Sequence, residues 1–107
     1  KDKLRDHFDK YDLLLSPTMA VQPFDCGIPP RVINDIDTDG SWACLPFTYP
    51  INLAGNPASS IPVGLTQAGL PVGLQIIGPF GAEEMVIAAS SAFEKSGYWS
   101  SQIPPIQ

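Results

Sequence analysis

Ser59-Ser-Ile-Pro-Val-Gly-Leu65, followed after a short turn by Pro71-Val-Gly-Leu-Gln-Ile-Ile-Gly78, carries the clearest structural pattern of the chain. Apolar residues alternate with small or polar ones in both halves, as in strands that bury one face. Gly69, between the halves, can adopt the positive φ that a tight turn requires. The sequence therefore predicts a β-hairpin. The apolar positions expected to share a face are Ile61, Val63 and Leu65 in the first strand and Val72, Leu74 and Ile76 in the second.

The segments on either side of this hairpin predict helices. Downstream, a helix is expected over about residues 82–96, with glutamates in its first turn and Lys95 in its last, as the helix dipole favours. Its apolar stripe consists of Met85, Val86, Ala89 and Phe93. Upstream, the apolar residues of 41–55 show no single period, and a short helix that ends at Gly55 is the preferred interpretation. The tail, residues 98–107, is expected to be extended.

The N-terminal part predicts a helix, a strand and a loop. Residues 1–11 carry apolar residues at helical spacing. The apolar run in residues 12–16 predicts a buried strand of a parallel or mixed sheet, which ends at Pro17 because proline has no amide hydrogen to donate. Residues 20–40 are rich in proline, glycine and aspartate and are expected to form a long loop. We therefore expect an α/β fold with the order helix, strand, long loop, short helix, β-hairpin, helix.

The charge of the chain limits its partners. The 107 residues carry a net charge of -5, whereas binding to nucleic acid requires a basic surface. The sequence contains no run of basic residues that would hold an anionic membrane. We therefore expect neither nucleic acid nor a membrane as a partner. The two cysteines, Cys26 and Cys44, are too few for a disulfide scaffold and are expected to be free thiols, which favours a cytoplasmic location.

One long segment has no charge. Residues 41–82 contain no Lys, Arg, Asp or Glu, and prolines interrupt them, so they do not form a membrane span. Such a segment is expected to be enclosed by other protein, and little of this chain is left to enclose it. The chain also starts inside or just before a helix, without an initiator Met. These observations favour a fragment of a larger protein.

Two kinds of catalytic or metal site are not expected from the residues present. His7, the single histidine, lies in a charged helix, and the chain has no G-x-S-x-G motif, so a Ser-His-Asp triad is not expected. His7, Cys26 and Cys44 do not have the spacing of zinc ligands.

An acidic segment resembles half of a calcium-binding loop. Asp35, Asp37 and Asp39 match the start of the pattern D-x-D-x-D-G, but Pro46 stands where the loop requires a bidentate Glu. A solvated acidic turn is therefore the better interpretation. No metal and no cofactor are expected.

One string of residues resembles the C-terminal signature of the amidase-signature family. It runs from Pro50 to Gly64 and from Gly69 to Pro79. The family pattern reads roughly N-x-x-G-x-P-A-x-x-x-P-x-G, a short turn, and then G-L-P-x-G-x-Q-x-x-G. The matching positions are Asn52, Gly55, Pro57, Ala58, Pro62, Gly64, Gly69, Leu70, Pro71, Gly73, Gln75 and Gly78. Residues 12–18 also resemble the strand and Pro-Thr turn found upstream in this family.

The resemblance implies a single α/β/α domain with a mixed sheet, of which residues 1–107 would be the C-terminal fragment. Members of the family hydrolyse a carboxylic amide to an acid and ammonia or an amine with a Ser–cis-Ser–Lys triad, and a Gly/Ser-rich loop stabilises the oxyanion. These catalytic residues lie upstream of the matched region. We therefore expect no catalytic residue in this chain, no activity from it alone, and the remainder of the amidase chain as its partner.

The resemblance also places two segments of this chain beside the substrate pocket. The wall residues that it implies are Thr18, Met19, Trp42, Leu45 and Pro50. Simple core packing is an open alternative for Trp42 and Leu45. Glutamine-handling subunits of transfer-RNA amidotransferases carry an Asp near the position of Leu45 to hold the amino group of the substrate. An apolar Leu45 therefore favours a neutral or hydrophobic amide.

The signature residues are expected to have structural roles. Glycines allow close approach of backbone and helix, prolines limit hydrogen bonding, and Gln75 can satisfy buried backbone groups. The residues assigned to this framework are Asn52, Gly55, Pro57, Pro62, Gly69, Pro71, Gly73 and Gln75. The alternative function is a non-catalytic interaction module derived from the same fold, and a second copy of the chain is a further candidate partner.

Overall fold

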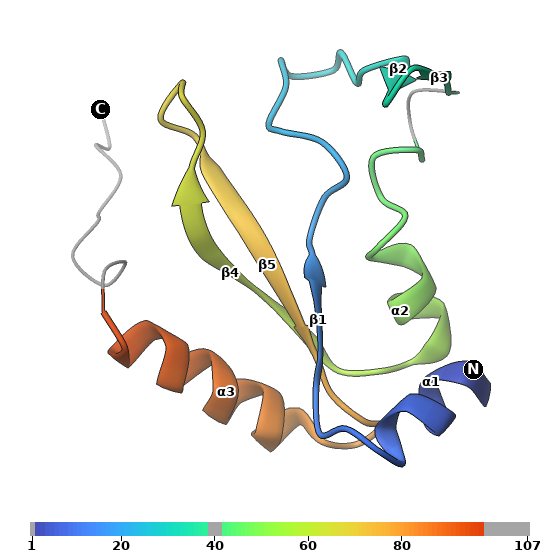
Figure 1. The fold of residues 1–107 in the computed structure, drawn as a ribbon, viewed down its shortest axis with the longest axis vertical. Coiled ribbons are helices and arrows are strands. Elements are labelled where there is room, and N and C mark those ends of the chain that lie inside the picture. Colours follow the sequence, from blue (N-terminus) through green and yellow to red (C-terminus); the bar gives the residue numbers. More distant parts are fainter. Residues whose placement is uncertain (1, 39–41, 98–107) are drawn as a thin grey trace.

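The structure is a computed structural model that describes residues 2–38 and 42–97, and its elements follow the predicted order except for two short strands in the expected long loop (Figure 1). The elements are α1 (Asp2–Phe8), β1 (Leu14–Pro17), β2 (Val32–Ile33), β3 (Ile36–Asp37), α2 (Tyr49–Ala54), β4 (Ala58–Leu65), β5 (Pro71–Ile77) and α3 (Glu83–Lys95). This confirms the predicted α/β fold class. The tail predicted to be extended, residues 98–107, lies outside the described residues.

Three strands form the main sheet, in the order β1-β5-β4. β4 and β5 make the predicted hairpin, which turns at Gly69 with φ 78°. β1 pairs with the other edge of β5, so that Leu15 lies opposite Ile76. All pairings among the described strands are antiparallel, so the parallel alternative expected for the sheet of β1 is not seen among them. A short apolar run does not reveal the direction of its neighbour, and β1 is not buried on both faces, because Leu15 is 57% exposed.

A β-bulge in β4 changes which side chains share a face. The register shifts between Pro62 and Gly64. Ile61 pairs with Leu74 and Leu65 with Pro71, three positions away on β5, so the prediction that Ile61, Val63 and Leu65 share one face is wrong for Leu65. Pro62 gives the physical reason, because it has no amide hydrogen for a regular ladder and irregular pairing accommodates it.

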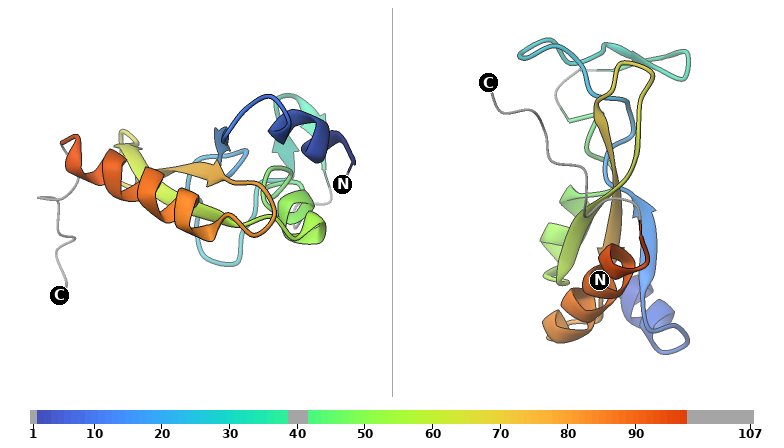
Figure 2. Two further views of the ribbon diagram at one scale, coloured as in Figure 1. Left: turned by 90° about the horizontal axis from the view of Figure 1, so that it is seen from below. Right: turned by 90° about the vertical axis from the view of Figure 1, so that its left-hand side faces the viewer.

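The helix α3 packs against β4 and β5. The hydroxyl groups of Ser59 and Ser90 join the helix to β4 at 2.7 Å. A Cβ atom at Gly78 would lie only 2.7 Å from Val86 Cγ2, so glycine permits the close approach of the helix at this position. Figures 1 and 2 show α3 on one side of the hairpin, with α1 and α2 beyond β1.

The helix α2 ends as predicted. Gly55 adopts a left-handed conformation with φ 78°, and its N–H donates to the carbonyl of Ile51 at 3.0 Å. A residue with a Cβ would be strained in this conformation, so the glycine terminates the helix. Pro50 stands in the first turn, where a missing N–H costs no helical hydrogen bond.

Residues 32–37 form a second hairpin, of β2 and β3, inside the segment expected to be a loop. Its two turn residues, Asn34 and Asp35, have φ of 50° and 62°. Asn and Asp tolerate positive φ better than other non-glycine residues, and a turn with two left-handed central residues matches the twist of a hairpin. The Asn-Asp pair between two apolar residues is the sequence signal for this turn.

The core is small and draws on β5, α2 and α3. The buried apolar residues are Cys44, Ile51, Ala54, Ile76, Ile77 and Val86. By contrast, many large apolar side chains of the described residues are well exposed, including Leu53 at 83%, Phe80 at 77% and Ile87 at 67%. Apolar surface of this extent is characteristic of a surface that other protein covers.

Candidate functional site

A polar cluster crosses one face of the main sheet. The register places Ser16 of β1 and Ser60 of β4 opposite Gln75 of β5, so the three side chains lie side by side on the same face. The Thr18 and Ser60 hydroxyl groups lie 2.7 Å apart and share a hydrogen bond. A Cβ atom at Gly73 would lie 2.7 Å from Thr18 Oγ1 and 2.8 Å from Ser60 Oγ. The glycine therefore lets the two hydroxyls meet across β5.

Gln75 is the most buried polar side chain of this cluster, with 5% exposure. Its Nε2 donates to the backbone carbonyl of Phe47 at 2.8 Å and to Ser16 Oγ at 3.0 Å. Gln75 thus donates to a backbone carbonyl, in a hydrogen bond that is partly buried. The side chain joins β1, β5 and the segment that precedes α2.

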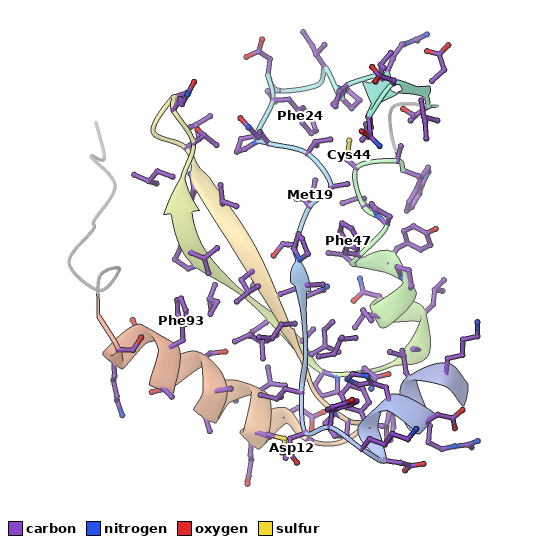
Figure 3. The ribbon with its side chains drawn as sticks, in the orientation of Figure 1. Asp12, Met19, Phe24, Cys44, Phe47 and Phe93 are labelled. Atoms are coloured by element: carbon purple, nitrogen blue, oxygen red, sulfur yellow. The ribbon has the colours of Figure 1, made fainter. Side chains whose placement is uncertain are left out.

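A second contact fixes the same segment to the chain that follows β1. The Ala20 N–H donates to the carbonyl of Cys44 at 3.2 Å. Thr18 is held in turn, because its N–H donates to the carbonyl of Gly73 at 3.0 Å. Figure 3 shows Met19, Cys44 and Phe47 gathered around the end of β1.

The structure brings three of the five predicted wall residues into one region and leaves two at its edge. Thr18, Met19 and Leu45 are half-buried and lie on the two segments that the Ala20–Cys44 contact joins. Trp42 is 63% exposed, and its ring lies edge-on to that of Tyr49, with 6.3 Å between the ring centroids. Pro50 is exposed at the start of α2. A substrate-binding role for these five residues stays a prediction.

A hollow of about 430 Å³ lies beside this region, between residues 19–24 and the start of β5. Met19, Phe24 and Val72 contribute to its lining, together with Gly73. This volume suits a small molecule. Residues 13–24 and 42–82 contain no Lys, Arg, Asp or Glu, so the hollow has a neutral lining.

Several signature residues lie at turns, element ends and close contacts, and their framework role stays a prediction. Gly55 and Gly69 end a helix and close a turn, Gly73 lies under the two hydroxyls, and Pro62 stands at the bulge. The carbonyl of Pro57 accepts from the Gly78 N–H at 2.9 Å, and Pro71 is the first residue of β5. Asn52 is exposed on α2.

The residues considered for other chemistry lie apart from this cluster. His7 Nε2 is 3.4 Å from the carbonyl of Leu13, at the start of the chain. Asp35 lies in the β2–β3 turn and Asp37 in β3, and residues 2–38 and 42–97 contain no group of three His, Cys, Asp or Glu that could hold a metal. Asp39 lies outside the described residues. Cys26 is exposed and Cys44 is buried, and no disulfide joins them in the part of the chain that the structure describes.

Most of this chain matches a known protein family. The profile of the amidase family matches residues 1–87. The chain belongs to the amidase family. Within the described part of this amidase chain, no helix has the length and apolar character needed to cross a membrane.

Relatives of this amidase chain match almost all of it. A glutamyl-tRNA(Gln) amidotransferase subunit of Clostridium acetobutylicum is 38% identical over 89% of the chain. A Mycobacterium tuberculosis protein named as amidase AmiA2 is 34% identical over 92% of it. The structure of 6-aminohexanoate cyclic dimer hydrolase matches 94% of the chain with a TM-score of 0.76 and 29% identity.

The chain spans only about a fifth of the length of these relatives, at 19%, 20% and 22%. They include both a protein named as an amidase and a glutamyl-tRNA(Gln) amidotransferase subunit, so similarity alone does not separate the two branches. The preference for a neutral amide drawn from Leu45 stays a prediction.

Proposed function

We propose that this chain is the C-terminal framework and part of the substrate-pocket wall of an amide hydrolase. The observation that carries the proposal is the match to the amidase family over residues 1–87, in a chain whose own sheet and helices leave large apolar side chains exposed. Relatives about five times as long supply enough protein to cover such surfaces. The catalytic residues would then belong to that larger body.

The proposed reaction is the hydrolysis of a carboxylic amide to an acid and ammonia or an amine. A serine attacks the carbonyl, a cis-serine relays the proton and a lysine acts as base, while backbone amides stabilise the oxyanion. The Thr18 and Ser60 hydroxyls hydrogen-bond to each other at 2.7 Å, and the proposal assigns this pair to the framework. We further propose that this chain has a structural role in the enzyme and that the protein is located in the cytoplasm.

The proposed substrate is a neutral or hydrophobic amide. Leu45 is apolar and half-buried, and the segments around it carry no acidic side chain that could hold a substrate ammonium group. Burying an unpaired charge against such a wall is costly, so a charged substrate would be disfavoured.

We expect the purified 107-residue chain to remain unlabelled by an alkyl fluorophosphonate and to release no product from simple aliphatic and aromatic amides. Intact-mass spectrometry measures the labelling, and full-length 6-aminohexanoate cyclic dimer hydrolase serves as the parallel control. Amide turnover that persists through purification and disappears when Ser60 or Ser59 is replaced with alanine would contradict the framework assignment.

A further inference from the structure

The segment of residues 42–48, called here the wall loop, is held to the rest of the fold by hydrogen bonds near both of its ends. Near its start, the carbonyl of Cys44 accepts from Ala20 N–H at 3.2 Å. Near its end, the carbonyl of Phe47 accepts from Gln75 Nε2 at 2.8 Å. Leu45 lies between these two contacts. The position of Leu45 therefore depends on both.

The wall loop also has its own turn structure. Leu45 N–H donates to the carbonyl of Trp42 at 3.0 Å, and Thr48 N–H donates to the carbonyl of Leu45 at 3.2 Å. These bonds shape the loop but do not attach it to the sheet. Attachment at its α2 end comes from the side chain of Gln75, which reaches the loop across 28 positions of sequence.

Gln75 itself has little freedom to move. It is 5% exposed, and Nε2 uses its two hydrogens on Phe47 and on Ser16 of β1. An amide with both hydrogens committed to fixed acceptors holds those acceptors at a set separation. A side chain that only packed in the core would need a suitable volume. The contacts with Phe47 and Ser16 also require a hydrogen-bond donor at position 75.

We infer that Gln75 is a positioning residue that holds the wall loop, and with it the specificity residue Leu45, against the sheet. The assignment of Leu45 as a specificity residue rests on the proposed function, whereas the attachment of the loop by Gln75 does not. The same side chain fixes Ser16, two residues before Thr18, so both predicted wall segments are set from one strand.

The first test replaces Gln75 with leucine, which keeps a similar volume and removes the donor. We expect amide hydrogen exchange of residues 44–49 to become roughly tenfold faster, because the Phe47 carbonyl loses its side-chain partner and the loop opens more often. Exchange in β4 and β5 should stay within about twofold. Gln67→Leu is the matched control, because Gln67 is exposed in the hairpin turn.

The second test uses Gln75→Glu in a Trp99→Phe background, in which Trp42 on the wall loop is the single tryptophan. A buried glutamic acid has a raised pKa, since burial disfavours its charged form. Below that pKa the protonated carboxyl can donate to Phe47. Above it, the carboxylate repels the carbonyl and releases the loop. The neighbouring segments, residues 13–24 and 42–82, contain no other Asp, Glu, Lys, Arg or His.

Fluorescence of Trp42 reports these states. We expect its anisotropy and resistance to acrylamide quenching to be high at low pH and to fall as pH rises in Gln75→Glu, with no such transition in Gln75 protein or in Gln67→Glu. A pH-independent Trp42 signal in Gln75→Glu, or unchanged exchange of residues 44–49 in Gln75→Leu, would overturn the inference. Global unfolding of both variants, seen as equal loss of protection in β5 and the loop, would also overturn it in favour of a purely structural role. None of these measurements uses amide hydrolysis, so they test the role of Gln75 independently of the proposed reaction.

Discussion

Replacing Ile77 with alanine is expected to cost about 2–5 kcal/mol and to abolish cooperative unfolding of the isolated chain. Ile77 is 1% exposed, and in the sheet it lies between Leu14 of β1 and Ala58 of β4. Truncation removes apolar contacts on both sides and leaves a cavity that the paired strands cannot close. Whole small domains are stabilised by only about 5–15 kcal/mol, so a chain with this small a core has little reserve.

Urea unfolding followed by far-ultraviolet circular dichroism measures this effect. Ile87→Ala is the matched control, because Ile87 is the same residue type on α3 with 67% exposure, and its loss should change stability by less than about 0.5 kcal/mol. Equal effects of the two substitutions would show that β5 is not the centre of the core.

Gly78→Ala is expected to destabilise the chain by about 1–3 kcal/mol, although alanine adds only one carbon atom. The new Cβ would lie 2.7 Å from Val86 Cγ2 and 3.4 Å from the carbonyl oxygen of Ala82. Val86 is 3% exposed, so its side chain would have to move against the packed core. The backbone cannot shift either, because Gly78 N–H donates to Pro57 and its carbonyl accepts from Asn56 Nδ2, each at 2.9 Å.

The expected consequence is separation of α3 from the hairpin, which thermal unfolding and the near-ultraviolet dichroism of the aromatic residues would report. Gly64→Ala is the control, because a Cβ atom there meets nothing within 4 Å. A stability loss at Gly64 as large as that at Gly78 would argue against close helix approach as the reason for the glycine.

Elements with local signals are predictable from the sequence. The hairpin, the helix stop at Gly55 and the final helix follow from alternation, glycine and charge at helix ends, which act over a few residues. These signals did not predict the β2–β3 hairpin, because its turn uses Asn34 and Asp35 in place of glycine. The direction of β1 escapes them because strand pairing is decided by segments far apart in sequence.

The polar cluster shows a similar division. The structural role of Gln75 is predictable, since a long amide in an uncharged strand needs buried partners. The pair of Thr18 and Ser60 is not, because 42 positions of sequence separate the two hydroxyls and only the register of β1, β5 and β4 brings them together. Gly73 carries the one available signal, a glycine within a strand, which marks close approach of another group.

The coding sequence immediately upstream of Lys1 separates a piece of an amidase from a free-standing module. We expect an open reading frame that continues upstream and encodes a Gly/Ser-rich loop with a serine nucleophile, preceded by a lysine that serves as base. A start codon directly before Lys1, with no such segment encoded upstream, would refute the framework assignment and leave the chain as a non-catalytic interaction module.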